Sequence, residues 1–163
     1  MNKILELIKK DQRNILKFKD KKISLDELKI LNSEISKVFL ELIKIRGFPY
    51  KNTTEPDTYK AAITLSLHLH KNDLEILFEN IKNSTKKMID SSDMAYLQDR
   101  VLVNKGKKQL YGTNFEWNAG GEIIFKPIED IKNVNKRRAE VGLCTLDEYK
   151  EFIKGKRDSV FKT

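Results

Sequence analysis

Hydrophobic residues in the first hundred positions recur at steps of three and four, the spacing of amphipathic helices. The longest stripe runs from Leu28 to Ile45 and follows Ser24 and Glu27, which have the spacing of an N-terminal capping box. Gly47 suits the C-cap of this helix because glycine readily adopts positive φ angles. The pattern predicts helices over residues 2–17, 24–46, 56–70, 73–89 and 92–103.

After residue 108 the hydrophobic period changes. An aromatic, alternating stretch begins at Gln109, an extended stretch ends at Phe125, and residues 118–121 between them are typical of a turn. Further on, Thr145 and Glu148 have the spacing of a second capping box. These features predict a hairpin over residues 109–126, helices over 133–141 and 146–154, and a frayed tail after residue 154.

The expected fold is mainly α with a small antiparallel β-hairpin (α+β). We expect a compact single-domain helical bundle over residues 1–163, with the hairpin packed on helices because a two-stranded ribbon is marginally stable alone. The chain of 163 residues and 19.0 kDa has the size of one domain, and its 39% hydrophobic residues suffice for a core.

No apolar run approaches the roughly 18 residues of a membrane-spanning helix, and the charged start is unlike a secretory signal. The single cysteine, Cys144, cannot form an internal disulfide and is expected to be a buried structural thiol. We therefore predict a cytoplasmic protein that contacts no membrane.

The chain is basic, with 32 Lys and Arg against 24 Asp and Glu, a net charge of +8 and a pI near 9.4. The excess is spread along the sequence, so nucleic acid is a disfavoured partner. The motifs of phosphate loops, dinucleotide folds, zincins and nucleophile elbows are absent from the sequence, and no cofactor is predicted.

His68 and His70 are the two histidines. Two residues apart on a helix, they would point to opposite faces and could not share a metal ion, so no metal site is predicted. A single histidine can act as an acid or base near neutral pH. The alternative, a histidine that only packs between helices, stays open.

The densest polar constellation begins with Asp99 and Arg100, continues through residues 109–113, and ends with Asp130, Arg137 and Arg138. Three guanidinium groups near one glycine could form an anion pocket. Internal pairing with the two aspartates is the other interpretation, and both stay open.

Several of these motifs resemble the uncharacterised bacterial family DUF6624. The shared stretches are Ala95–Val101, Gly106, Gln109–Thr113, Pro127, Asp130, Arg137–Arg138, Gly142–Leu143 and Glu148–Tyr149, with Asp11–Arg13, Gly47–Pro49 and Leu67–His68 upstream. The resemblance covers about residues 11–153. Leu67 and Asn114 stand where the family usually has glutamine.

The resemblance implies no established activity, only that a set of polar residues occupies motif positions. Our first hypothesis is a site for an anionic small molecule in which His68 moves a proton and Asp99 or Asp11 sets its tautomer. His68 and Asp99 are the catalytic candidates. The candidate ligand-binding residues are Asp11, Gln12, Arg13, Arg100, Gln109, Tyr111, Gly112, Thr113, Asp130, Arg137 and Arg138.

Two other hypotheses belong to different functional classes. A protein-interaction module, such as an immunity or accessory factor, would expose Phe48, Tyr50, Phe115 and Trp117 to a protein partner. A weak non-specific nucleic-acid binder would use the lysine-rich faces.

Overall fold

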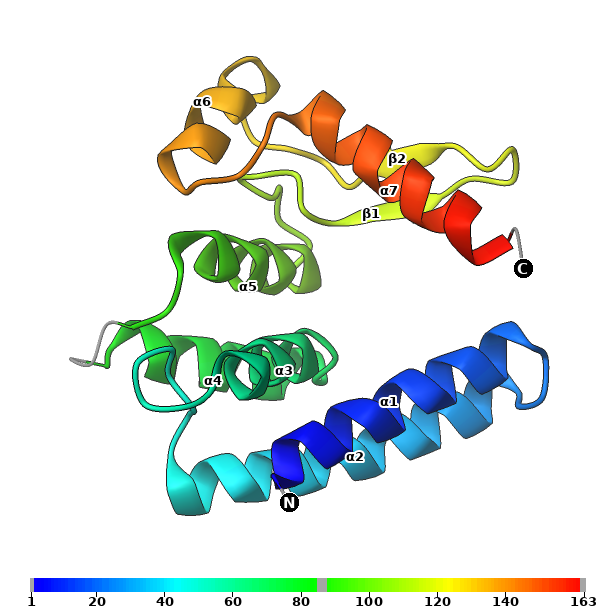
Figure 1. The fold of residues 1–163 in the computed structure, drawn as a ribbon. Coiled ribbons are helices and arrows are strands. Elements are labelled where there is room, and N and C mark those ends of the chain that lie inside the picture. The colour runs from blue at the N-terminus through cyan, green and yellow to red at the C-terminus, as the bar shows by residue number, and fades with distance from the viewer. Residues whose placement is uncertain (1, 85–87, 162–163) are drawn as a thin grey trace. The chain divides into compact units, whose positions relative to one another are not determined.

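The computed structural model describes residues 2–84 and 88–161. The fold is mainly α with a small antiparallel hairpin, as predicted (Figure 1). By its internal contacts the chain divides into two compact units, an N-terminal unit, Met1–Ile89, and a C-terminal unit, Asp90–Thr163. The expected single domain over residues 1–163 stays a prediction, and each unit is described by itself.

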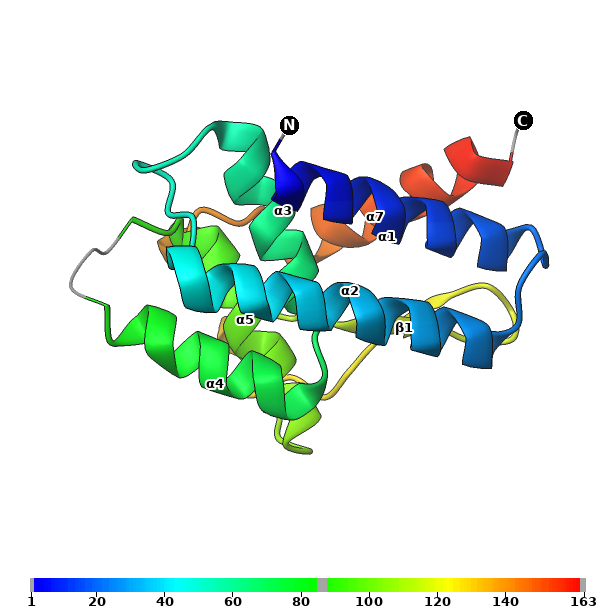
Figure 2. The ribbon, with the colours of Figure 1, turned by 90° about the horizontal axis from the view of Figure 1, so that it is seen from below.

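The N-terminal unit consists of four helices: α1 (Lys3–Lys19), α2 (Leu25–Arg46), α3 (Pro56–Leu67) and α4 (Lys71–Lys82). Helices α1 and α2 lie side by side, and α1 also packs against α3 (Figures 1 and 2). Burial of their apolar faces is the main stabilising term. The core side chains include Leu7, Ile35, Phe39, Tyr59, Ala62, Leu65, Leu74, Leu77 and Phe78.

The predicted capping box of α2 is confirmed. The Glu27 backbone N–H donates to Ser24 Oγ at 3.2 Å, and the Ser24 N–H donates to Glu27 Oε2 at 2.7 Å. The hydrogen bond from the Ser24 backbone N–H lowers the pKa of Glu27, and the Ser24 side chain lowers it further. At the other end Gly47 is the C-cap with φ 77°, and Pro56 occupies the first turn of α3, where its missing N–H costs nothing.

Three predicted helix ends were wrong. The helix predicted over 56–70 ends at Leu67, because the next N–H groups turn back to carbonyls three residues earlier. The helix predicted over 73–89 runs only from Lys71 to Lys82, and its predicted residues 85–87 lie outside the described residues. The predicted frayed tail is instead helical, since α7 continues to Phe161.

The C-terminal unit contains α5 (Ser91–Asn104), the strands β1 (Phe115–Trp117) and β2 (Ile123–Phe125), the 3₁₀ turn η1 (Ile131–Asn133), α6 (Val134–Glu140) and α7 (Leu146–Phe161). The hairpin packs on α7, as the prediction requires (Figure 1). Its core joins Ile123 of β2 to Tyr149 and Ile153 of α7. The capping box at the start of α7 is confirmed, with the Thr145 N–H donating to Glu148 Oε2 at 2.8 Å.

The hairpin is shorter than the predicted range 109–126. Its register pairs Phe115 with Phe125 and Trp117 with Ile123, and the side chain of Asn118 closes the turn by accepting the Glu122 N–H at 2.8 Å. Residues 109–114 form a loop instead of extending β1. The loop departs from the sheet because its N–H groups bond a carboxylate of α5, described below.

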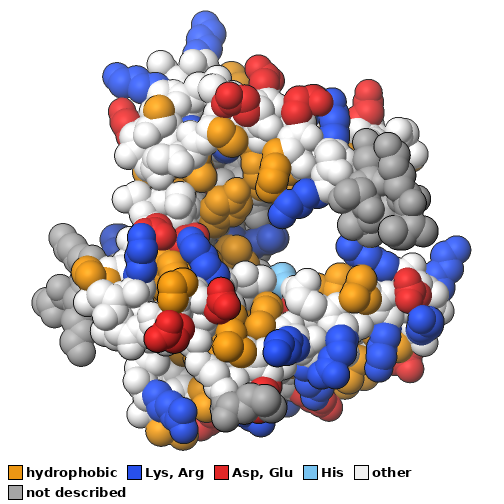
Figure 3. Space-filling view, in the orientation of Figure 1, with side chains coloured by type: hydrophobic (Ala, Val, Ile, Leu, Met, Phe, Trp, Pro, Cys, Tyr) orange, Lys and Arg blue, Asp and Glu red, His pale blue; other side chains and the backbone are white. Residues whose placement is uncertain are grey.

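On the face seen in Figure 3, lysine and arginine side chains are spread over the surface with acidic side chains between them. This distribution agrees with the spread of charge along the sequence. In the part of the chain that the structure describes, no helix is long and apolar enough to cross a membrane.

Candidate functional site

A buried carboxylate and a histidine meet in the N-terminal unit. Asp11 lies on the inner face of α1 with 1% of its side chain exposed, and its Oδ1 is 3.1 Å from His68 Nδ1. The amide Nε2 of Gln12 donates to Asp11 Oδ2 at 3.0 Å. The neighbouring Arg13 is exposed, and its Nε donates to the Lys9 carbonyl of the same helix. Within the Asp11–Arg13 motif, Asp11 therefore contacts His68 and Gln12 contacts Asp11, whereas Arg13 contacts neither.

The two histidines stand in the turn between α3 and α4, not within a helix as predicted. His68 is the C-cap residue of α3 and His70 is the N-cap residue of α4. The expectation that they point to opposite faces of one helix was therefore wrong, and both line the same cleft. Among residues 2–84 and 88–161, no group of three His, Cys, Asp or Glu side chains is arranged to hold a metal ion.

The cleft has a volume of about 580 Å³, which is within the range of small-molecule sites. One wall is the turn from His68 to His70 with Asp73 of α4, and the other is a face of α2. The Oδ1 atom of Asn32 is buried there and has no hydrogen-bond partner among the residues that the structure describes. The α2 wall consists of Lys29, Asn32, Ser33, Ser36, Lys37 and Leu40.

Sequence reasoning missed this wall, although a signal was present. Lys29, Asn32, Ser33, Ser36 and Lys37 recur at steps of three and four, like the apolar stripe of the same helix but on another face. A polar stripe is normally a solvated helix surface. Only the tertiary position of the α3–α4 turn makes it the wall of a cleft.

In the C-terminal unit, Asp99 of α5 organises the loop that precedes β1. Its side chain is fully buried and accepts the backbone N–H groups of Leu110, Tyr111 and Thr113 at 2.7 to 3.1 Å. The Thr113 hydroxyl donates a further bond at 3.0 Å. Burial, followed by the nearby Asp99, raises the pKa of the Tyr111 phenol. The Asp99 carboxylate therefore holds its own loop, and the residue that contacts His68 is Asp11.

Gln109 performs a similar structural role with an amide. Its side chain is fully buried, and Nε2 donates to the carbonyls of Asn114 and Lys126, both at 2.9 Å. Its Oε1 accepts the Asn114 N–H at 2.8 Å. The side chain thus ties the two sides of the hairpin base together, and neither polar atom is without a protein partner.

Gly112 permits the tight path of this loop, with φ +69°. A Cβ there would lie 2.8 Å from Leu146 Cδ1 and 2.9 Å from Ile128 Cδ1. We expect Gly112→Ala to destabilise the unit by about 2 kcal/mol, through backbone strain and contact with those side chains. Gly142→Ala is the control, because φ is +74° but the space is open, and it should cost about 1 kcal/mol. Denaturant unfolding followed by Trp117 fluorescence measures both, and equal losses would contradict the steric part of this prediction.

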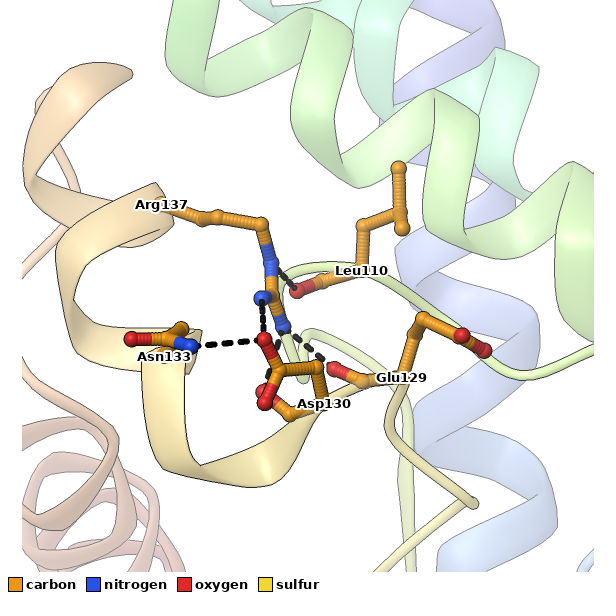
Figure 4. Close-up of polar contacts among 5 residues, drawn as sticks. All are labelled: Leu110, Glu129, Asp130, Asn133 and Arg137. Atoms are coloured by element: carbon orange, nitrogen blue, oxygen red, sulfur yellow. Dashed lines mark hydrogen bonds and ion pairs between the residues drawn. The ribbon is translucent and has the colours of Figure 1, made fainter.

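Arg137 of α6 secures the segment that follows the hairpin (Figure 4). Its Nε donates to the Leu110 carbonyl at 2.9 Å, and its Nη2 donates to the carbonyls of Glu129 and Asp130. The carboxylate of Asp130 lies 3.7 Å from Nη1 and accepts Asn133 Nδ2 at 2.7 Å. Of the two interpretations left open for Asp130, internal pairing with Arg137 is present, and the guanidinium also bonds three carbonyls.

Arg138 is fully buried, and its guanidinium bonds main-chain carbonyls. Nη1 donates to the Tyr111 carbonyl and Nε to the Cys144 carbonyl, each at 2.5 Å. The guanidinium carbon also lies 5.0 Å from the ring centre of Tyr149, a cation–π distance. The Tyr149 hydroxyl in turn donates to the Thr113 carbonyl at 3.3 Å. Arg138 therefore joins α6, α7 and the loop.

The loop over residues 109–114 contains the Gln109–Thr113 motif. Its conformation is held by Asp99, Gln109, Gly112, Arg137 and Arg138. Residues 69–159, more than half of the chain, match the family described as a family of unknown function, DUF6624. The chain belongs to this family. No curated protein and no solved structure matches it.

The DUF6624 match contains the Asp99, Gln109–Thr113, Asp130 and Arg137–Arg138 positions. It starts at residue 69, so the upstream resemblance at Asp11–Arg13 and Leu67–His68 stays a prediction. Within the matched region, Asp99, Gln109 and the two arginines make hydrogen bonds that hold the loop over residues 109–114.

Two further expectations are changed by the structure. Cys144 is exposed, so the prediction of a buried thiol was wrong, although both its carbonyl and its Sγ atom contact the Arg138 guanidinium. Among the aromatic residues expected on a docking surface, Phe48 is 8% exposed and Trp117 is 36% exposed. The protein-interaction and nucleic-acid hypotheses stay predictions.

Proposed function

We propose that the N-terminal unit binds an anionic small molecule in the cleft between α2 and the α3–α4 turn, and that His68 exchanges a proton with it. The observation that carries this proposal is the contact of 3.1 Å between the buried carboxylate of Asp11 and His68 Nδ1. A buried carboxylate is costly unless it is paired, and here its partner is an imidazole that lines a cleft.

The pair gives the imidazole a defined chemistry. Because an ionised carboxylate only accepts hydrogen bonds, Asp11 holds the proton of neutral His68 on Nδ1. The lone pair is then on Nε2, which acts as the general base. After Nε2 takes a proton, the adjacent carboxylate stabilises the imidazolium. Asp11 is thus a positioning residue, and His68 is the catalytic candidate.

The α2 wall indicates what the cleft would bind. Lys29 is paired with Asp26 at 2.9 Å, whereas Lys37 has no ion pair with any described residue. A carboxylate or phosphate of the ligand would pair with Lys37. The unpartnered Oδ1 of Asn32 would accept a hydroxyl or amine proton of the same ligand. Asp73 lines the cleft as well and disfavours a ligand with several negative charges.

The proposal differs from the sequence hypothesis in its binding residues. Gln109, Arg137 and Arg138 were expected to hold the ligand, but their polar atoms bond main-chain groups of the C-terminal unit. Their role in the proposal is therefore to maintain that unit. The anion-binding side chain of the cleft is instead Lys37.

Replacing Asp11 tests the dyad without knowledge of the ligand. Diethyl pyrocarbonate acylates an unprotonated imidazole nitrogen, and mass spectrometry measures the rate at each histidine. We expect Asp11→Asn to slow acylation of His68 severalfold at about pH 9, well above the ordinary histidine pKa, because the neutral amide orients and activates the ring less than a carboxylate. His70, whose imidazole makes no hydrogen bond with a described residue, is the internal control. Equal rates at His68 in both proteins would contradict the dyad.

Binding is tested with small carboxylates and phosphate monoesters, observed through the ring resonances of His68 by NMR. We expect a ligand from this panel to shift His68, and Lys37→Gln to weaken its affinity by roughly tenfold. Lys29→Gln is the matched control and should change the affinity less than twofold, because Lys29 already pairs with Asp26. A panel that leaves His68 unshifted, or equal losses in both variants, would refute the binding proposal.

A further inference from the structure

Arg100 of α5 differs from Arg137 and Arg138 of the same unit. Its Nε is buried without a hydrogen-bond partner, and the guanidinium makes no hydrogen bond or ion pair with any described residue. By contrast, the guanidinium groups of Arg137 and Arg138 each bond main-chain carbonyls. Of these three arginines, Arg100 is therefore the one that the network among the described residues leaves unused.

The adjacent aspartate does not compensate this charge. The Asp99 carboxylate is taken up by three N–H groups and one hydroxyl of residues 110–113, and none of its bonds is to Arg100. Consecutive side chains on a helix diverge by about 100°, so the two residues face different sides of α5. The internal pairing that the sequence left open for Asp99 and Arg100 is absent.

The surroundings of Arg100 are aromatic. Tyr96 lies one turn earlier, on the same side of α5, and packs edge to face with Tyr149, with ring centres 6.2 Å apart. Burial lowers the pKa of Arg100, and the nearby Tyr149 opposes this shift. The same Tyr149 ring carries the guanidinium of Arg138 on its face. Two cations thus lie near one aromatic ring, and the contacts of both with described residues include no carboxylate.

An arginine in this state is costly to the folded protein. A buried guanidinium N–H that has left water and bonds nothing loses most of its hydration energy. A guanidinium has a rigid fork of donors that matches the two oxygens of a carboxylate or phosphate. A ligand oxyanion would both supply the missing acceptor and neutralise the charge.

We infer that Arg100 anchors an oxyanion, a carboxylate or a phosphate, on the side of α5 that carries Tyr96. This site uses residues of the C-terminal unit alone, and it does not depend on the cleft of the N-terminal unit or on His68. It also gives a function to a motif residue of the matched family that the loop network does not employ.

The test uses the full chain with inorganic phosphate and succinate as probes, each compared with chloride at equal ionic strength. At least one probe should raise the melting temperature of the wild-type protein by binding linkage. Calorimetric titration should show at least about a tenfold loss of affinity for that probe in Arg100→Met. The probe that binds distinguishes phosphate from carboxylate recognition. Arg46→Gln, at an exposed arginine of α2, should retain the wild-type affinity.

A measurement in chloride alone separates binding from a structural role. Arg100→Met keeps the apolar stem and removes an unpaired buried charge, so its melting temperature without oxyanion should equal or exceed that of the wild type. A lower melting temperature would assign Arg100 to folding and overturn the inference. So would a wild-type protein that neither probe stabilises, or a variant that binds the probe as tightly. The Arg100→Met comparison is repeated in the Lys37→Gln protein, whose cleft has lost its anion-binding side chain. A tenfold difference that persists in this background belongs to Arg100, so failure here and failure of the proposed cleft are distinguishable.

Discussion

Asp99→Ala is expected to destabilise the C-terminal unit by about 4 kcal/mol, the largest single-residue effect that the structure predicts. The substitution removes the acceptor of three backbone N–H groups and the Thr113 hydroxyl, all of which converge on a fully buried carboxylate. Each stranded donor costs on the order of 1 kcal/mol, after some are rehydrated by movement of the loop. Trp117 lies in β1, so its fluorescence during denaturant unfolding reports on this unit.

The isosteric Asp99→Asn variant sharpens this test. An amide offers one acceptor oxygen but sets an NH₂ group against backbone donors, so we expect a loss of about 2 to 3 kcal/mol. Asp130→Asn is the matched control, because that side chain is half exposed and its left-handed backbone, φ 40°, suits asparagine. It should change stability by less than about 1 kcal/mol. Equal effects at the two aspartates would mean that Asp99 does not organise the loop.

The helices could be predicted because their signals are local. The Ser24 and Glu27 pair and the Thr145 and Glu148 pair form capping boxes in the structure, since both partners lie within one turn. Gly47 ends α2 for an equally local reason, its positive φ. Steps of three and four in hydrophobicity likewise describe a face of a single helix. Such features need no knowledge of the rest of the chain.

The loop over residues 109–114 could not be predicted in this way. Its alternating aromatic pattern favours a strand, and the strand would extend β1 by six residues. The competing partner is a carboxylate more than ten residues earlier, whose buried oxygens offer these N–H groups better acceptors than water. The Gln109 side chain then bonds the Asn114 N–H and the Lys126 carbonyl, which would have paired with each other in a longer strand. Periodicity contains no information about such a partner.

The site residues also depend on partners that are distant in the sequence. Polar motif positions alone cannot distinguish a ligand-binding arginine from one that bonds main-chain carbonyls, and Arg137 and Arg138 prove to be of the second kind. Asp11, which lies 57 residues before His68 in the sequence, was one of the two aspartates considered as partners of this histidine. The sequence could suggest the pair by residue type, whereas the packing of α1 on α3 selects Asp11.

The second large effect is expected at Arg138. Arg138→Met should destabilise the C-terminal unit by about 3 kcal/mol, because methionine fills much of the volume but leaves the carbonyls of Tyr111 and Cys144 without their donors. Loss of the contact with the Tyr149 ring adds to this. Arg138→Lys should be nearly as damaging, since one ammonium cannot reproduce a fork that reaches two separate carbonyls. Denaturant unfolding by Trp117 fluorescence measures both variants.

Lys136→Gln is the control on the same helix, because its side chain is exposed, and it should change stability by less than about 0.5 kcal/mol. Whether Arg138→Met lowers or raises stability distinguishes an arginine that bonds the main chain from one that is kept for a ligand. A guanidinium kept for a ligand is a cost to the free protein, so its removal would leave stability unchanged or raise it, as we expect for Arg100. A guanidinium that bonds the main chain stabilises the free protein. A stable Arg138→Met variant would therefore place Arg138 with Arg100 in the oxyanion site, whereas the hydrogen bonds to Tyr111 and Cys144 lead us to expect the opposite.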